Sequence, residues 1–399
     1  MRGGRTTKWV AVMSPDPFAG LTLRIVDGVS TLPENEWTGC FPNEVEGWRY
    51  YRACEHAPSE RNPISAAEVR DEKGLLIAAP LFTISYRLDT PFQGLLGRFG
   101  ARLAAKFPKL LEWRLLGIGS PYADRCHIAI RPGLTREEQA RAINALISLV
   151  ESEARRLGAA LIAYKDLAGP DRDLLNRPLS QRQYGEIRSL PVAALNIPES
   201  WDAYLSRLSA HMRKDVRRKL KKSKAITVER RTDIDGVASE IEALYQSTRA
   251  NSSVRYGDFE ELPENYFAAI AEQLGDRALF ILYRIDGQLA AFNLLLLEED
   301  RVIDKFLGMA YPLARENNLY IVSWMENVRF CLETGRAVLQ SGQTAYGSKV
   351  RLGSQLVPSW NLVKHRNPLI NRVIRLAAPL LAFDRWDPDL KHIKAFGRL

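Results

Sequence analysis

The chain has 399 residues, of which 46% are hydrophobic, so it can bury sizeable cores and is long enough for two domains. Its net charge of +9 favours anionic partners: nucleic acid, acidic lipid headgroups or phosphorylated cofactors. The four cysteines and five histidines lie scattered, without C-x-x-C or metal-ligand spacing. We therefore expect a reducing compartment, no disulfide framework and no metal.

No segment has the composition of a membrane-spanning helix, which needs about 20 predominantly apolar residues. The run that comes closest, Ala278–Leu297, is interrupted by Arg284, Asp286 and Gly287. Near the N-terminus, Trp9–Met13 is too short for a signal-peptide core. We expect a soluble or peripheral cytoplasmic protein, the peripheral case lying at the inner face of the cytoplasmic membrane.

The first half of the chain predicts strands around one long helix. We expect strands over 64–71, 75–87, 113–116 and 159–164, and a helix over 135–157. Thr135 and Glu138 have the spacing of a capping box, and Gly158 ends the helix. The polar, proline-containing stretch 166–191 predicts a domain boundary near 190.

The second half repeats this order of elements. We expect helices over 201–224, 237–248, 266–274 and 318–334, and strands over 226–229, 278–284, 289–297, 301–308 and 337–339. The fold class is therefore α/β (α+β), with two modules that each contain a mostly antiparallel central sheet flanked by helices. The predicted domains are 1–190 and 191–370, followed by a C-terminal amphipathic tail, 371–399.

Lysine and arginine are densest between residues 207 and 224, above an apolar stripe with helical spacing. Like charges four residues apart destabilise a helix. A contact of Arg217 and Arg218 with phosphates or headgroups therefore competes with the simpler interpretation of a solvated helix face. The aromatic residues that would stack on single-stranded nucleic acid are missing here.

Two further features contain charged residues that are candidates for a functional site. Asp304 and Lys305 interrupt an otherwise apolar strand, and buried or cleft-lining charges are costly unless they are paired. The segment 340–358 contains several glycines and hydroxyls together with Lys349 and Arg351, so it can bind an anion or simply form a surface loop. Its spacing is not that of a Walker loop.

The order of these features resembles the Fem-type branch of the GNAT superfamily. The resemblance rests on the basic R-K-D-V-R-R-K-L-K-K helix, the hairpin with its D-G turn, the third strand, and G-x-x-x-x-G-x-K-x-R-x-G from Gly342 to Gly353. It covers about 195–370, and 20–190 more loosely. This branch includes peptidoglycan-bridge aminoacyltransferases, bacterial N-acyltransferases named as peptidoglycan biosynthesis proteins, and proteins similar to bacterial ceramide synthases.

The resemblance implies tandem GNAT-like modules and a donor ester beside splayed strands of the C-terminal module. An amine attacks the donor directly, without a covalent enzyme intermediate. By this analogy Lys349 and Arg351 would lie by the donor or acceptor phosphates and Tyr346 near the departing group. Together with the features above, the candidate catalytic residues are Asp304 or Glu326 as base and Tyr346 as acid. The candidate substrate- or donor-binding residues are Lys305, Arg315, Gln343, Lys349, Arg351, Arg217 and Arg218. Family members that bind coenzyme A carry a glycine-rich pyrophosphate loop before the next helix, but 310–320 contains no glycine. Backbone N–H groups and Arg315 would replace that loop.

A last segment bears on location. Apolar residues keep helical spacing over Leu369–Leu381, with Arg366, Arg372 and Arg375 beside them. Together with the apolar and basic segment Gly94–Pro108, this predicts either a membrane-surface element or a helix packed on its domain. Each basic residue near anionic lipid adds about 1 kcal/mol of attraction.

We therefore predict an N-acyltransferase that moves a long-chain acyl group from acyl-CoA or acyl-carrier protein to a lipid amine, such as a sphingoid base, and forms a ceramide-type amide. The thioester is a co-substrate, and no permanently bound cofactor is expected. The expected partners are the acyl thioester, the lipid amine and an anionic membrane surface. One alternative is a Fem-like aminoacyltransferase that uses aminoacyl-tRNA and a peptidoglycan precursor. The other is a membrane- or nucleic-acid-binding adaptor on an inactive GNAT fold.

Overall fold

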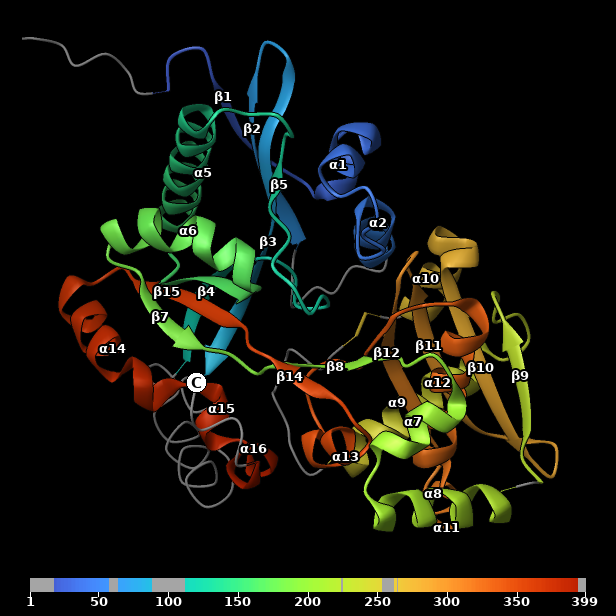
Figure 1. The fold of residues 1–399 in the computed structure, drawn as a ribbon. Coiled ribbons are helices and arrows are strands. Elements are labelled where there is room, and N and C mark those ends of the chain that lie inside the picture. Colours follow the sequence, from blue (N-terminus) through green and yellow to red (C-terminus); the bar gives the residue numbers. More distant parts are fainter. Residues whose placement is uncertain are drawn as a thin grey trace, which may run out of the picture.

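The structure is a computed structural model that describes residues 18–56, 64–87, 112–223, 225–252, 262–263 and 265–393. Two lobes, each built on one sheet, lie side by side (Figure 1). The predicted segment Gly94–Pro108 lies outside the described residues. Within the described ranges, no helix is both long and apolar enough to cross a membrane.

The first sheet has the strand order β1-β2-β3-β4-β6-β15-β7, with β5 beside β3. Its strands are β1 (Thr22–Val26), β2 (Ile64–Asp71), β3 (Gly74–Arg87), β4 (Glu112–Ile118), β5 (Ala129–Ile130), β6 (Leu161–Leu167), β7 (Gly185–Arg188) and β15 (Trp360–His365). Only β4 and β6 pair in parallel.

Helices cover both faces of this sheet. They are α1 (Glu34–Cys40), α2 (Trp48–His56), α5 (Arg136–Arg156) and α6 (Gly169–Gln181). The predicted capping box is confirmed, since Thr135 and Glu138 exchange both hydrogen bonds at the start of α5. Ile143 and Leu146 of α5 pack into one core of the sheet, while Trp37 belongs to the core under α1.

The second sheet has the order β14-β8-β13-β12-β11-β10-β9. Its strands are β8 (Val192–Asn196), β9 (Thr227–Arg231), β10 (Ala278–Ile285), β11 (Gln288–Leu297), β12 (Arg301–Met309), β13 (Val338–Gln340) and β14 (Gln355–Val357). The helices of this lobe are α7 (Trp201–Arg207), α8 (Ala210–Lys222), α9 (Ala238–Asn251), α10 (Tyr266–Leu274), α11 (Leu313–Glu316), α12 (Leu319–Thr334) and α13 (Tyr346–Arg351).

These helices also cover two faces. Ile241 of α9 and Phe267 of α10 share one core with β10 and β11, whereas Tyr204 of α7 and Met325 of α12 belong to the other. Only β12 and β13 pair in parallel. The predicted fold class, two helix-flanked and mostly antiparallel sheets, is confirmed.

The chain changes sheets twice. It passes from β7 to β8 near residue 190, where we predicted a boundary, and returns from β14 to β15. Strand β15 pairs with β6 and β7 of the first sheet, although the sequence division places 360–365 in the C-terminal module. The tail follows as α14 (Pro368–Leu381), α15 (Phe383–Trp386) and α16 (Pro388–His392). The pattern of apolar residues in a strand such as β15 does not determine which of the two sheets the strand pairs with.

Two local predictions were wrong. The helix predicted over 201–224 is two helices, because Leu208 has an extended conformation and the Ser209 side chain caps α8 by accepting a hydrogen bond from the Met212 N–H (3.2 Å). The segment 340–358 is not all loop, since it contains α13 and β14.

Candidate active site

Strands β12 and β13 separate after a short parallel pairing. The pairing joins Arg301–Ile303 of β12 to Val338–Gln340 of β13 and extends no further. Asp304 is the next residue of β12, and from there to Met309 the strand pairs with β11 alone. The splayed strands implied by the resemblance are therefore present, with Asp304 at the point of divergence.

A β-bulge lies at the same point. Leu294 pairs with Phe306 and Leu295 with Asp304, so Lys305 is the extra residue of β12. Because a bulge interrupts the alternation of side chains between the two faces of a sheet, it can re-aim neighbouring side chains. Here Asp304 contacts residues within the second lobe, whereas Lys305 contacts the first lobe.

Asp304 lies in a buried polar group. Its Oδ1 accepts a hydrogen bond from Asn293 Nδ2 (2.8 Å), and Asn293 Oδ1 accepts one from the Tyr283 hydroxyl (3.2 Å). Burial raises the pKa of Asp304 to about 6, against the opposing effects of Lys349, Asn293 and Asn327. Asp304 is therefore a carboxylate at neutral pH that can accept a proton readily.

Lys349 lies on α13, close enough to interact electrostatically with Asp304. It is only 7% exposed, and its Nζ donates hydrogen bonds to the backbone carbonyls of Ser341 and Gly342 (3.4 Å to Gly342). Desolvation lowers the pKa of Lys349 to about 8, although Asp304 and Asp124 favour its charged form. Lys349 thus ties α13 to the residues that follow β13.

Lys305 joins the two lobes. Its Nζ lies 2.6 Å from Glu46 and 3.8 Å from Asp124, both in the first lobe, and its side chain is 3% exposed. Interaction with these two carboxylates raises the pKa of Lys305 despite burial. With its charge occupied by Glu46 and Asp124, Lys305 is placed to hold the lobes together rather than to bind a substrate.

A hollow of about 440 Å³ opens where α8, α11, α12 and α13 meet the end of β12. Its apolar lining includes Met212, Met309, Ala314, Ile321 and Leu352. Its polar lining includes His211, Asp215, Lys219, Tyr311, Arg315, Asn318, Tyr320, Ser348 and Arg351. The lining therefore combines apolar side chains with polar and charged ones.

Arg315 and Arg351 give this hollow a positive charge. Among the described residues neither guanidinium forms an ion pair: Arg351 donates to the Gly347 carbonyl (3.0 Å), and Arg315 stacks on the Tyr311 ring at 5.0 Å. Asp215 is neutralised by Lys219 (2.8 Å) and by Arg218 (2.6 Å). Since Asn318 precedes the first turn of α12, the N–H groups of that turn add to the attraction for an anion.

Tyr320 also lines the hollow. Its hydroxyl is buried and has no hydrogen-bond partner among the described residues. Burial raises the pKa of Tyr320, Asp304 and Asp389 raise it further, and Arg351 opposes them. Sequence reasoning did not select this residue, although it is the last residue of the glycine-free segment 310–320 and lies in the first turn of the helix predicted over 318–334.

The structure does not bring the other predicted residues into the hollow. Tyr346 is fully buried, and its hydroxyl donates to the Pro191 carbonyl (2.8 Å). Glu326 pairs with Arg230 (2.7 Å), and Gln343 Nε2 donates to the Leu190 carbonyl (2.9 Å). These contacts fix the neighbouring chain segments. Tyr320 is the tyrosine of α12 that lines the hollow, with its hydroxyl buried, and Asp304 is not among the lining residues.

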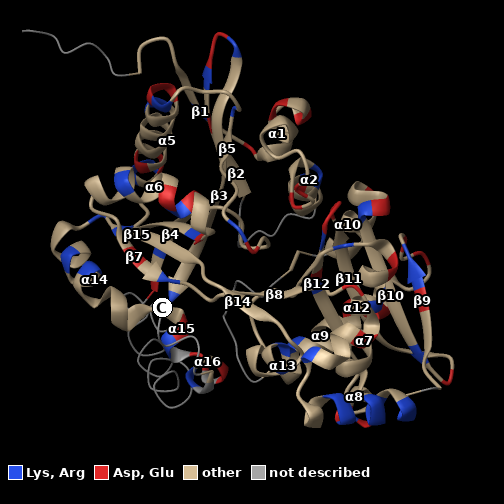
Figure 2. Cartoon of the chain, viewed as in Figure 1, with Lys and Arg blue, Asp and Glu red and all other residues tan. Residues whose placement is uncertain are grey.

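Arg217 and Arg218 belong to α8, a helix rich in lysine and arginine (Figure 2). Both are exposed and neither lines the hollow, whose wall uses His211, Met212, Asp215 and Lys219 of the same helix. The basic helix therefore turns one face to the hollow and a cationic face to solvent.

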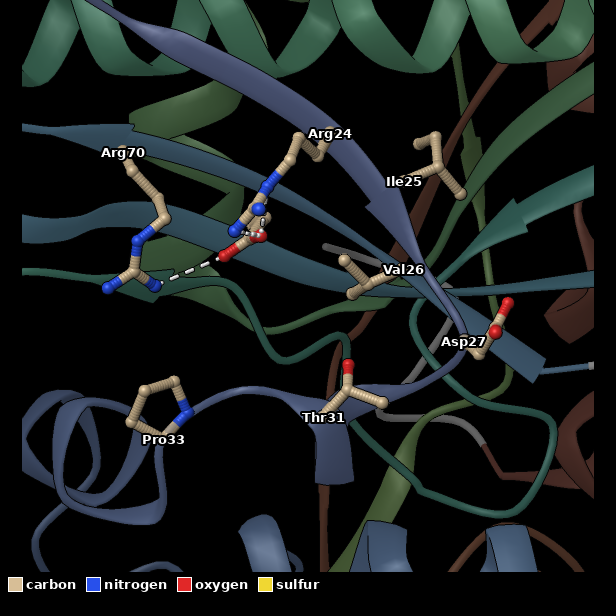
Figure 3. A pocket seen from close by; sticks show the side chains of 8 residues that line it. Arg24, Ile25, Val26, Asp27, Thr31, Pro33 and Arg70 are labelled. Atoms are coloured by element: carbon tan, nitrogen blue, oxygen red, sulfur yellow. Dashed lines mark hydrogen bonds and ion pairs between the residues drawn. The ribbon is translucent and has the colours of Figure 1, made fainter.

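A second hollow, of about 650 Å³, lies beside β1 in the first lobe (Figure 3). Its two arginines, Arg24 and Arg70, both pair with Glu68, at 2.6 and 3.1 Å. Its cations are therefore already neutralised, and it lies beside the first sheet, whereas the strands that separate belong to the second sheet. We place the candidate active site at the smaller hollow for these reasons.

One group of side chains has the composition of a metal site. Glu44, Glu46 and His127 place one ligand atom each within 4.8 Å of one another. Lys305 pairs with Glu46, while Arg301 and Arg125 each approach Glu44 at 3.5 Å. Because these three cations already neutralise the two carboxylates, a metal ion would have to displace them, and the absence of a metal site stays a prediction.

Comparison with known proteins addresses the class of this site. Residues 210–349 match the family described as "Acetyltransferase (GNAT) domain". The chain carries a GNAT domain. The match spans α8 to α13 and so contains the splayed strands, Asp304 and most of the hollow. Enzymes of this family transfer an acyl group from a donor such as acyl-CoA to an amine, so the protein is an acyltransferase.

The fold of the whole chain is similar to that of solved structures. The crystal structure of FemX superposes with a TM-score of 0.53 at 13% identity, over 87% of this chain and 96% of that one. The C-terminal domain of a lysylphosphatidylglycerol synthetase from Agrobacterium fabrum has a TM-score of 0.49 at 13% identity, over 84% and 91% of the two chains. A tandem GNAT protein from the clavulanic acid biosynthesis pathway has a TM-score of 0.45 at 10% identity, over 87% of this chain and 99% of that one. No curated protein sequence matches this chain.

Proposed function

We propose that the GNAT domain transfers a long-chain acyl group from the thioester of coenzyme A or acyl-carrier protein to a lipid amine, such as a sphingoid base. The observation that carries this proposal is the hollow beside the splayed strands. Arg315, Arg351 and the start of α12 offer positive charge for the phosphates of the donor. The apolar lining offers a surface for the rest of the donor.

Asp304 and Tyr320 supply the proton transfers in this proposal. The amine nitrogen attacks the thioester carbonyl carbon, so a C–N bond forms and the C–S bond breaks. The Asp304 carboxylate, with its pKa of about 6, takes the proton that the nitrogen loses. Tyr320, whose raised pKa keeps the hydroxyl protonated, donates to the departing sulfur. Direct attack needs both substrates bound together, so initial-rate patterns should intersect.

Specific features support a lipid acceptor. The protein has a net charge of +9, and the outer face of α8 is cationic. Anionic bilayers attract such surfaces. An anionic membrane surface is therefore the partner we propose beside the thioester and the amine, and the inner face of the cytoplasmic membrane is the proposed location.

The fold of FemX favours one alternative, aminoacyl transfer from tRNA to a peptidoglycan precursor. The same cationic hollow and the same base would serve that reaction. A test separates the two: purified protein is incubated with palmitoyl-CoA and a sphingoid base, and in parallel with aminoacyl-tRNA and a peptidoglycan precursor. We expect free thiol and an amide, detected by mass spectrometry, in the first reaction only. Turnover in the second reaction alone would establish the alternative.

A further inference from the structure

The outward side of α14 exposes a row of large apolar side chains. Leu369 is 77% exposed, Val373 64%, Leu376 76% and Leu380 53%. Successive spacings of four, three and four residues place them on one face of the helix. Single exposed apolar residues are common on protein surfaces, but a continuous row marks an interaction site. We refer to these four residues as the α14 stripe.

The helix is firmly held by its other side. Asn371 and Ala378 are buried on the face opposite the α14 stripe. Asn371 accepts a hydrogen bond from the His365 N–H and donates one to the Gln183 carbonyl, both at 2.9 Å. At the start of the helix, Asn367 caps the N–H groups of Leu369 and Ile370. The α14 stripe is thus presented by an anchored helix at the edge of the first lobe (Figure 1).

The charged residues of α14 and of its flanking sequence are all positive. Arg366, Arg372 and Arg375 are exposed, and residues 351–383 contain no aspartate or glutamate. Among the described residues, Arg366 and Arg372 form no ion pair, while Arg375 donates to the Gln183 side chain. An apolar row with arginines beside it is the composition of a helix that lies in the headgroup region of an anionic bilayer.

We propose that α14 docks the protein on an anionic lipid surface, with the α14 stripe in the bilayer interface and Arg366 and Arg372 against the headgroups. Charge complementarity selects this occupant. A second copy of the chain would set two stripes face to face and bring their arginines together without any acidic residue between them. A planar anionic surface satisfies all the arginines at once.

This inference rests on the proposed function in one respect, because it names the surface by which the enzyme reaches a lipid acceptor. Vesicle binding itself needs neither donor nor acceptor. A failure of binding can therefore be distinguished from a failure of acyl transfer.

The test is co-flotation of the full chain with two kinds of vesicle, one of phosphatidylcholine alone and one of phosphatidylcholine and phosphatidylglycerol in equal parts. The wild type should bind the anionic vesicles, less so as salt increases. Leu369→Gln with Leu376→Gln should lower the partition coefficient by about tenfold or more per side chain, since two large apolar groups no longer leave water. Arg366→Gln with Arg372→Gln should weaken binding and flatten its salt dependence.

Val228→Gln is the matched control, because Val228 is also exposed (38%) but lies on β9 in the second lobe. It should bind like the wild type, and all the variants should unfold at the wild-type temperature because the replaced side chains are exposed. Vesicle binding by Leu369→Gln with Leu376→Gln at the level of the wild type would overturn the inference. Vesicle binding that is lost only when Lys214 and Arg217 of α8 are replaced would overturn it as well. If the wild type is a dimer that binds no vesicles, and Leu369→Gln with Leu376→Gln converts it to a monomer, the α14 stripe is a contact with a second copy instead.

Discussion

Replacement of Asp304 by asparagine removes a buried carboxyl group while keeping an oxygen that can accept the hydrogen bond from Asn293. Burial raises the pKa of Asp304 from 3.8 to about 6. This rise corresponds to about 3 kcal/mol in favour of the neutral carboxyl. The carboxylate needed as a base at neutral pH therefore costs folding stability.

The sign of the pH dependence follows from this pKa. The folded protein retains the Asp304 proton to higher pH than the unfolded chain, so the contribution of Asp304 to stability is present below about pH 4 and lost as the pH rises through about 6. Asp304→Asn has no such loss. Relative to the wild type, its free energy of unfolding should rise by up to about 3 kcal/mol between about pH 4 and pH 7.

Denaturant unfolding followed by circular dichroism at a series of pH values measures this difference. Asp276→Asn is the control, because Asp276 is exposed and the same substitution there should leave the pH dependence unchanged. Asp304→Asn should also lose acyl transfer, while its affinity for the donor is retained. A stability difference that is constant across this pH range, or full activity in the variant, would refute the role of Asp304.

The remaining predictions concern Lys305 and the two tyrosines. Lys305→Met should destabilise the protein by about 3–5 kcal/mol at neutral pH in denaturant unfolding, because it leaves Glu46 buried without its cation. Adding Glu46→Leu to the same chain should recover most of that loss. Equal stability of the single and double variants would contradict the buried pair. Tyr346→Phe should cost about 1–2 kcal/mol of stability through the lost bond to Pro191, with kcat within twofold of the wild type. Tyr320→Phe should leave stability unchanged and lower kcat on the order of 100-fold; the reverse pattern would return the acid role to Tyr346.

The periodicity of the sequence was sufficient for α5, α9, α10 and α12, for most strands and for the fold class, but α1, α2 and α6 were not predicted. The capping box at Thr135 and Glu138 specifies its helix locally, so its prediction needed no tertiary information. The return of β15 to the first sheet could not be predicted, since its partners β6 and β7 are separated from it by the whole second lobe. The break at Ser209 was missed because the apolar stripe continues across it.

The candidate site was predicted in part. A charge in an apolar strand was the reason for selecting Asp304, whose catalytic role stays a prediction. The same argument for Lys305 could not foresee that Glu46, far away in the sequence, would neutralise it. Arg315 and Arg351 were both selected, and the fold brings them to one hollow. The selection of Tyr346 rather than Tyr320 shows the limit of motif order, because the direction and burial of a hydroxyl depend on how the helices pack.

The hollow between α8, α11, α12 and α13 is the proposed binding site of the phosphate-bearing donor. Titration calorimetry of coenzyme A and palmitoyl-CoA with the wild type and with Arg315→Gln plus Arg351→Gln tests it most directly. Each guanidinium that contacts a phosphate should contribute about tenfold to affinity, so the double variant should bind roughly 100-fold more weakly. Arg207→Gln, exposed on α7 outside the hollow, should bind like the wild type. Equal affinity of the double variant and the wild type would contradict the assignment of this hollow as the donor site.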